Sequence, residues 1–483
     1  MKICVLSLDG AAPDLIFQDE RLGNLRRMME VGVYGALQGV VPPATVPSWM
    51  CMTASQDPGS LGVYGPRTRR SYSSYALEAV DSNWVQPCNL SDHIAQAGKK
   101  SIVVAVPPNY PVRPIAGISI GCWLTPDSAK DDFTHPASIR ARLREQVGDY
   151  AVDVRHPFGS GKDAQRDAIF AMSRKQWETA RWLLREQEWD YFHFLDIGIN
   201  RVQHAFWSCF DPEWPGFVAG NPYQSVIPDY YLWLDEQIGS VMEMLDADTS
   251  LLVVAGYGTQ RLQGAVALNQ WLLAEGLLVL EAVPAQATPF DRLKVDWSRT
   301  RAWSEGGDCA QLFINLQGRE PQGVVPAAEY DSFRAQLKDK LLRLGSELGA
   351  PPQVAAPAEI YSQVRNTSPD LVVNFSGQGW RALDTVGHPG VYLAPGDLED
   401  GCSHSQTGSF VLAAPNCPLN GEFEGAGLLD LAPTLLDLAG YSLPSSMQGR
   451  SLVAGMEKPS AFDGGDAEQE KLIHDRLAGL GYV

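Results

Sequence analysis

The chain has 483 residues, of which 45% are hydrophobic and 20% charged, and its formal net charge at pH 7 is −19. This length exceeds one simple core, so we expect either one large domain with a substantial insertion or two domains. The acidic residues are scattered and no basic face is evident, which argues against nucleic acid as a partner. No stretch approaches the ~20 apolar residues of a membrane span, so no membrane partner is expected.

The first residues read as a strand rather than a signal peptide. MKICVLSLDG has only a short apolar run before Asp9, whereas a secretory leader carries a longer one. The eight cysteines form no CxxC pair or cluster, which is typical of reduced, mostly buried thiols and not of structural zinc. These features predict a cytoplasmic protein.

Strand and helix patterns alternate along most of the chain. A strand in KICVLSLDG precedes a helix in LGNLRRMMEVG, and a helix followed by an apolar strand recurs in residues 91–107, 174–198 and 235–258. Such repeats indicate a mostly parallel sheet that is covered by helices on both faces.

Residues 280–375 differ from this pattern. They have Pro-rich ends, shorter strands and one amphipathic helix in AEYDSFRAQLKDKLLRLG, after which a strand, SFVLAAP, and a helix, LLDLAPTLLDLAG, resume the first pattern. The sequence therefore predicts an α/β core in residues 1–279 and 376–483, with an inserted α+β subdomain in 280–375 near the mouth of the site.

Polar residues gather where the predicted strands end and helices begin, which is where open α/β sheets bind ligands. Asp9 suits either a turn or catalysis, and Thr45, just before Pro47, suits either an N-cap or a nucleophile at an anion-attracting helix start. Asn200 and His204 are four residues apart and share a helical face. They fit either a hydrogen-bonded pair or a metal site, and His404, just before a strand, is equally ambiguous alone.

The order of the motifs LDG, PPATVPSW, NRVQHAFW, HSQTGSF and LAPTLLDLAGYSLPSSMQGRSL resembles the alkaline phosphatase superfamily. Its type I phosphodiesterase and nucleotide pyrophosphatase branch is the most similar group. The resemblance implies an alkaline-phosphatase-like fold that hydrolyses phosphate or sulfate esters with two metal ions. It assigns Asp9, the nucleophile Thr45 and positions 256 and 257 to one metal, and position 200, His204 and His404 to the other.

This chain departs from that pattern at three positions. Gly256 and Tyr257 stand where the family has Asp-His, and Asn200 stands where it has Asp. Glycine offers no ligand, a phenol with a pKa near ~10 is a poor one at neutral pH, and asparagine brings no charge. Two ions ~4 Å apart would repel with almost no carboxylate between them. We therefore expect no two-metal centre.

One divalent ion, zinc, manganese or iron, remains compatible with His204, His404 and Asp9, and so does a metal-free site. Asn200 would add a weak contact, and Asp196, one turn earlier, is a conceivable substitute carboxylate. We expect Tyr257 to fill the vacated volume by packing, in preference to hydrogen-bonding an anion or acting as a general acid.

Three functions are consistent with the sequence. The first is a family member without phosphoester turnover that keeps its pocket to bind a small phosphorylated or sulfated ligand or a partner. The second is an enzyme with altered one-metal or metal-free chemistry, such as a transferase, a hydrolase or a biosynthetic tailoring enzyme. An ordinary two-metal phosphodiesterase is the third, and it requires that other residues replace the lost ligands.

Overall fold

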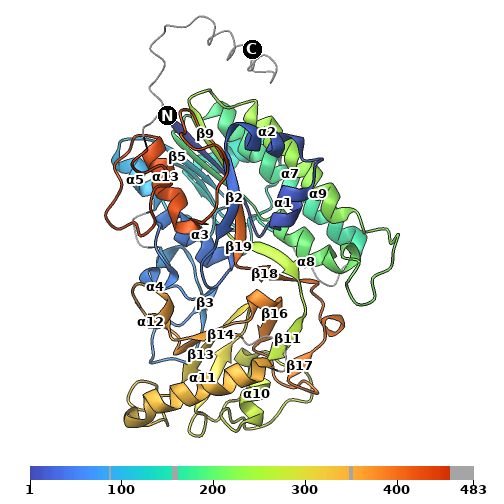
Figure 1. Cartoon of the computed structure of the whole chain (residues 1–483), viewed down its shortest axis with the longest axis vertical. Helices are drawn as coiled ribbons and strands as arrows, with labels where there is room; N and C mark the ends of the chain where they lie inside the picture. The colour runs from blue at the N-terminus through green and yellow to red at the C-terminus, as the bar shows by residue number, and fades with distance from the viewer. Residues whose placement is uncertain (86–88, 155–160, 347–351, 457–483) are drawn as a thin grey trace, which may run out of the picture.

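A computed structural model of the chain describes residues 1–85, 89–154, 161–346 and 352–456. Its largest feature is a ten-stranded sheet in the order β20-β2-β19-β9-β1-β8-β5-β6-β7, with β21 also paired to β2 (Figure 1). The strands are β1 (Lys2–Leu8), β2 (Val33–Gln38), β5 (Ser101–Val104), β6 (Gly117–Ile120), β7 (Thr134–His135), β8 (Tyr191–Asp196), β9 (Thr249–Ala255), β19 (Thr407–Ala413), β20 (Gly421–Glu422) and β21 (Ala426–Gly427).

The centre of this sheet is parallel, as the sequence predicts. Strands β9, β1, β8, β5 and β6 pair in parallel, whereas β19 runs antiparallel to β9 and β2, and β7 antiparallel to β6. Side chains of β1 alternate between two cores: Cys4, Leu6 and Leu8 enter one, and Ile3 and Val5 enter the other. The strand is thus buried on both faces, which explains its continuous apolar run.

Helices cover both faces of the sheet. One face packs against α1 (Pro13–Gln18), α2 (Gly23–Val31), α6 (Ser138–Val147), α7 (Lys162–Glu186), α8 (Gly198–Phe210) and α9 (Val226–Met242). The other packs against α3 (Thr45–Ala54), α5 (Leu90–Gln96) and α13 (Leu431–Leu438), with α4 (Pro58–Leu61) beside α3. Within the described residues, no helix combines the length and apolar character needed to cross a membrane.

A second part of the molecule lies at the lower end of the view in Figure 1. Its antiparallel sheet has the order β12-β13-β15-β14, and a smaller sheet has the order β16-β11-β17. The strands are β11 (Gly264–Ala267), β12 (Ala302–Glu305), β13 (Cys309–Ile314), β14 (Gln353–Ala355), β15 (Leu371–Asn374), β16 (Trp380–Leu383) and β17 (Tyr392–Leu393), and the helices are α10 (Leu268–Ala274), α11 (Tyr330–Ser346) and α12 (Pro357–Ile360).

The apolar core of this second part draws on residues from Val266 to Val386, and so extends beyond 280–375 at both ends. The division at 279/280 and 375/376 stays a prediction. Two ribbons complete the fold: β10 (Gly258–Arg261) with β18 (Cys402–Ser405), and β3 (Arg67–Thr68) with β4 (Glu78–Ala79). Short 3-10 turns occupy Ser82–Trp84, Phe290–Arg292, Ala327–Glu329, Ser376–Gln378, Pro395–Asp397 and Leu428–Asp430.

Two charged contacts tie the second part to the segment around β3. Arg69 and Glu320 are fully buried, and Arg69 Nη1 donates to Glu320 Oε1 at 3.0 Å. Arg67 Nη1 lies 3.2 Å from Oε1 of Glu305 on β12. Burial raises the pKa of Glu305 to about 7, and the nearby charge of Arg67 only partly opposes that rise. Of the two pairs only Arg69–Glu320 is buried on both sides, and Glu320 also accepts from Arg319 Nε at 3.1 Å. Removing Arg69 is costly because a buried carboxylate would lose one of its two charged partners.

Candidate active site

The predicted site residues meet at the carboxyl edge of the main sheet. Asp9 directly follows β1, Tyr257 lies just beyond β9, and α8 follows β8, and these three strands are neighbours. Thr45 is the first residue of α3. His404 lies on β18, which pairs with β10, the strand that follows β9. Hydrogen bonds and ring contacts join the side chains of Asp9, Thr45, Asn200, His204, Tyr257 and His404 into one group.

Asp9 is the one carboxylate of this group; it is fully buried and accepts three hydrogen bonds. Trp49 Nε1 donates to Oδ1 at 2.7 Å, while Thr45 Oγ1 and the Tyr257 hydroxyl donate to Oδ2 at 2.9 and 2.8 Å. Burial raises the pKa of Asp9, and the three donors reduce that rise without cancelling it. Because Thr45 and Trp49 are one turn apart, helix α3 delivers two of the donors. Asp9 therefore lies in the turn that follows β1, and its carboxylate is held by three side-chain donors.

Tyr257 takes part in this network through its hydroxyl. The oxygen lies 2.8 Å from Asp9 Oδ2 and 2.9 Å from Thr45 Oγ1, and the side chain is fully buried. Burial and the charge of Asp9 raise the pKa of Tyr257 well above its usual value, so the phenol stays protonated at neutral pH. Its ring also packs on His404, with centroids 4.5 Å apart. Tyr257 thus fills this buried volume, as expected, and its hydroxyl in addition bonds the carboxylate and the candidate nucleophile.

Both ends of the Asn200 amide are engaged. Its Nδ2 lies 3.3 Å from the Tyr257 hydroxyl, and its Oδ1 accepts from Arg201 Nη1 at 3.0 Å. Arg201 is in turn held by Asp153 through contacts of 2.9 and 2.7 Å. The amide oxygen thus faces a guanidinium, which is an unfavourable place for a metal cation.

His204 and His404 face each other through their Nε2 atoms, which are 3.3 Å apart. The Nδ1 atom of His204 contacts Asp400 at 2.8 Å, and that of His404 lies 2.9 Å from the Pro43 carbonyl oxygen and 3.0 Å from Asp308 Oδ2. Burial opposes a charge on His404, but the carboxylate of Asp308 outweighs it and raises the His404 pKa. Both rings are therefore fixed from behind by carboxylates.

Arg381 lies between these two carboxylates and neutralises part of their charge. Its Nη1 is 2.8 Å from Asp400 Oδ2 and its Nε is 3.6 Å from Asp308 Oδ1. Burial opposes ionisation, but the nearby histidine charges and Arg381 hold the pKa of both carboxyl groups well below the usual range. No sequence motif singled out these residues. The only signals are the Gly-Gly pair before Asp308 and the position of Asp400, four residues before His404.

Gly256 has room for a side chain, but the atoms nearest to its Cβ would not belong to the other site residues. A Cβ at this position would lie 3.4 Å from Ser48 Cβ and 3.5 Å from Leu428 Cδ1, which are ordinary contacts. The Ser48 hydroxyl has no hydrogen-bond partner among the described residues. A polar group introduced at 256 would therefore meet this serine and an apolar side chain.

Asp196 does not substitute for the missing carboxylate. Its Oδ1 accepts from the backbone nitrogen of Ile199 at 2.8 Å, and Trp177 and Tyr230 donate to the same carboxyl group. The side chain thus holds the first turn of α8 and the helices packed behind it. The conceivable role as a metal ligand is wrong, because the donors that surround Asp196 belong to the core beneath α8 and not to the site.

A cavity of about 290 Å³ opens above this group between the two parts of the molecule. Thr45, His204 and His404 contribute from the main part, and residues 306–309 line it from the second part. Trp123 and Arg201 form another wall. This volume is that of a small organic ligand, and the second part helps to enclose it.

The residues present do not fit a pair of metal ions. The Tyr257 hydroxyl occupies the point where Asp9 and Thr45 converge, and the Asn200 oxygen is turned to a guanidinium. Two imidazole nitrogens on one tetrahedral zinc, each at ~2.0–2.1 Å, are about 3.3 Å apart, which matches the His204 and His404 separation. These two side chains would hold a single ion, which would act there as a Lewis acid.

A second cluster of potential ligand atoms lies behind His204. Asp400 and the buried Cys402 come within 4.8 Å of it. Burial raises the pKa of the Cys402 thiol well above its usual value, and Asp400 is already paired with Arg381. A cation would therefore have to displace a guanidinium and deprotonate a buried thiol, so this cluster is structural.

The fold and the position of the site define an alkaline-phosphatase-like α/β protein. The sequence model of the type I phosphodiesterase / nucleotide pyrophosphatase family matches residues 3–409, and the chain belongs to this family. No curated protein matches the chain in sequence.

Solved structures share the fold at low identity. Human ectonucleotide pyrophosphatase / phosphodiesterase 5 is 13% identical with a TM-score of 0.52, and the match covers 92% of this chain and 96% of that one. The inactive murine form of that enzyme in complex with AMP is 14% identical, with the same TM-score and coverage. Phosphonoacetate hydrolase from Sinorhizobium meliloti 1021, in complex with phosphonoformate, is 15% identical with a TM-score of 0.57, covering 91% and 95%.

Proposed function

We propose that this protein is a phosphodiesterase-family member that lacks the family's two-metal hydrolysis and uses its pocket to bind a small phosphorylated or sulfated ligand. The observation that carries the proposal is the Tyr257 hydroxyl, which is bonded to Asp9 at 2.8 Å and to Thr45 at 2.9 Å. A protonated phenol in this position supplies hydrogen bonds in place of a dication. It leaves the Thr45 hydroxyl without an ion to lower its pKa, and Thr45 is then a slow nucleophile.

The charges around the pocket support weak binding of an anion. Arg201 and His404 bring positive charge, but each has a carboxylate partner, Asp153 and Asp308 respectively. Without metal ions, a phosphate group would rely on hydrogen bonds from groups that are already neutralised in part. A phosphodiester or a sulfate ester, which carries a single charge, suits this pocket better than a free dianion. The AMP and phosphonoformate bound to the structural neighbours are more highly charged, and they support only the expectation of a small phosphorus-containing ligand.

The test combines metal analysis with hydrolysis of p-nitrophenyl phosphate and its bis-ester in added zinc or manganese. The proposal expects fewer than two ions per chain and turnover far below the ~10 per second of a typical enzyme. Thr45→Ala should not lower any residual rate, and Thr53→Ala, another threonine on α3, is the matched control. Two bound ions together with turnover that only Thr45→Ala abolishes would overturn the proposal.

A one-metal enzyme is the second candidate, and the 3.3 Å separation of the His204 and His404 Nε2 atoms favours it. Both rings are held at Nδ1 by carboxylates, which is the usual support for metal-binding histidines. One equivalent of zinc, lost in His204→Ala and in His404→Ala but kept in Tyr257→Phe, would favour this candidate over the metal-free one.

A further inference from the structure

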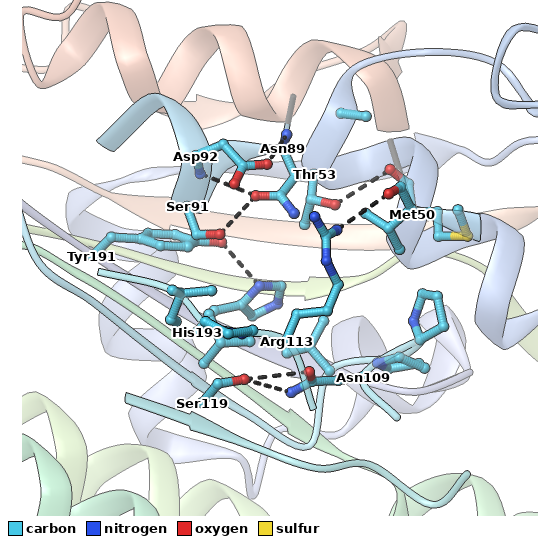
Figure 2. A pocket seen from close by; sticks show the side chains of 18 of the residues that line it. Met50, Thr53, Asn89, Ser91, Asp92, Asn109, Arg113, Ser119, Tyr191 and His193 are labelled. Atoms are coloured by element: carbon cyan, nitrogen blue, oxygen red, sulfur yellow. Dashed lines mark hydrogen bonds between the residues drawn. The ribbon is translucent and has the colours of Figure 1, made fainter. Parts of the chain in front are cut away.

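A second cavity lies beside the C-terminal half of α3, whereas Thr45 is the first residue of that helix. Met50, Thr53 and Ala54 of α3 form one wall, and its volume is about 100 Å³ (Figure 2). Tyr191 and His193 of β8 also line it. None of the predicted site residues contributes to this cavity, so it is separate from the pocket above Thr45.

Arg113 is the only charged donor that reaches across this cavity among the described lining residues. Its side chain extends toward Asn89 and Thr53 (Figure 2), and Nη1 donates to the Val85 carbonyl at 3.2 Å. Within the described parts of the chain it has no carboxylate at ion-pair distance. A guanidinium has five N–H donors, so most of them stay available to a ligand.

The amide of Asn89 adds an uncharged donor beside this guanidinium. Its oxygen accepts from the Ser91 hydroxyl at 2.7 Å and from the Asp92 backbone nitrogen at 3.1 Å, which fixes the orientation of the amide. The NH₂ group is therefore the part that remains to face a ligand. Asp92 also lines the cavity, but its carboxylate accepts from the Asn89 backbone nitrogen at 3.1 Å on the side away from Arg113 (Figure 2).

The remainder of the cavity is apolar or neutral. Met50, Leu61, Val103 and Ile115 supply apolar walls. Both ring nitrogens of His193 are occupied, by Ser7 and Tyr191, and burial lowers the pKa of His193 to about 3, so the floor carries no charge. Two convergent donors, one of them charged, above an apolar floor are typical of sites for small acids.

We infer that this cavity binds a small carboxylate with a short apolar chain, its carboxylate bonded by Arg113 and Asn89. Benzene, with six heavy atoms, occupies an engineered cavity of ~150 Å³, so the volume here accommodates about four to five heavy atoms, as in acetate or propionate. The planar fork of arginine matches a carboxylate in two parallel hydrogen bonds. Pro107, Pro108 and Pro114 line the cavity and restrict its backbone, which favours a preformed site.

Calorimetric titration of the full chain with acetate, propionate, neutral propionamide and inorganic phosphate tests this inference. We expect saturable binding of propionate that exceeds that of propionamide by about tenfold or more, the effect of one charge-assisted hydrogen bond. Arg113→Gln should weaken propionate binding by a similar factor. Arg26→Gln is the matched control, because Arg26 is also half-buried and also donates to one backbone carbonyl, that of Phe17.

Four outcomes would overturn the inference. Propionamide binding as tightly as propionate would show that the charge of Arg113 is not used. Phosphate binding as tightly as propionate, with the same loss in Arg113→Gln, would make the site a general anion site. Propionate binding that survives Arg113→Gln would place the ligand elsewhere, and loss of binding in Thr45→Ala would place it in the pocket above Thr45.

Discussion

Removing the Tyr257 hydroxyl is the most direct perturbation of the candidate site. In Tyr257→Phe, Asp9 loses the donor at 2.8 Å and keeps those from Trp49 and Thr45. A hydrogen bond to a charged group contributes about 1.5–3 kcal/mol, and two donors remain. We therefore expect the free energy of unfolding to fall by about 2 kcal/mol.

Tyr231→Phe provides a matched control for this measurement. Tyr231 is also buried, and its hydroxyl bonds two neutral groups, the Ala12 nitrogen at 2.8 Å and Gln203 Oε1 at 2.9 Å. These two groups are already 3.3 Å apart and can satisfy each other when the hydroxyl is gone. The control should therefore cost about 1 kcal/mol, the net value of one neutral hydrogen bond.

Urea unfolding followed by tryptophan fluorescence, with a chelator present, compares both variants with the wild type. The prediction is a larger loss for Tyr257→Phe than for Tyr231→Phe with unchanged slopes against urea. An equal or smaller loss for Tyr257→Phe would refute the reasoning. It would mean that the hydroxyl does not stabilise a charged carboxylate in the metal-free protein.

Three further changes test other parts of the molecule. The triple variant Asn200→Asp, Gly256→Asp, Tyr257→His should bind more zinc ions per chain in calorimetry than the wild type, and no single one of these changes should have that effect. Unchanged zinc binding in the triple variant would mean that the backbone of the site has also changed. Glu305, with a folded pKa of about 7 against an ordinary 4.5, binds its proton more tightly when folded. The contribution of protonated Glu305 to the free energy of unfolding is complete below pH 4.5 and is lost as pH rises through 7. The loss is about 3 kcal/mol, at about 1.36 kcal/mol per unit of pKa shift. In urea unfolding, the stability of Glu305→Gln should not fall over this pH range. A fall equal to that of the wild type would contradict the raised pKa of Glu305. Arg69→Met should lower stability by about 3 kcal/mol because Glu320 stays buried and keeps only Arg319 Nε, at 3.1 Å, as a charged partner, and a loss below about 1 kcal/mol in urea would show that the pair adds little.

The sequence predicted which residues meet wherever a strand end carried the residue, whereas their roles stay a prediction. Asp9 and Tyr257 follow adjacent parallel strands, and the carboxyl ends of such strands share one edge of the sheet. Position in the sequence was therefore sufficient to bring these residues together. The direction of a side chain was not predictable in the same way. Asp196 ends its strand equally well, yet it turns toward Trp177 and Tyr230 below the site.

The residues that support the histidines were not predictable from local patterns. Asp308 and Arg381 belong to the second part of the chain, which folds back over the edge of the main sheet, and both meet His404 or its partners only through this packing. Their sequence surroundings carry no periodicity that marks a contact more than twenty residues away. The hydrogen bonds of Tyr257 to Asp9 and Thr45 were not predictable for a related reason: the reach of a phenol depends on the backbone position, which the loss of metal ligands alone does not reveal.

The substitutions at 200, 256 and 257 are consistent with one another on electrostatic grounds. A site built for two dications needs several carboxylates, and each of these becomes an uncompensated buried charge when the ions are absent. This site retains one central carboxylate, Asp9, and surrounds it with three uncharged donors, while Asn200 and Gly256 add no further negative charge. A single reversion, such as Gly256→Asp, would add a carboxylate that faces Ser48 and Leu428 rather than a cation. The arrangement is thus self-consistent in charge without metal ions, and a two-metal centre requires several simultaneous changes.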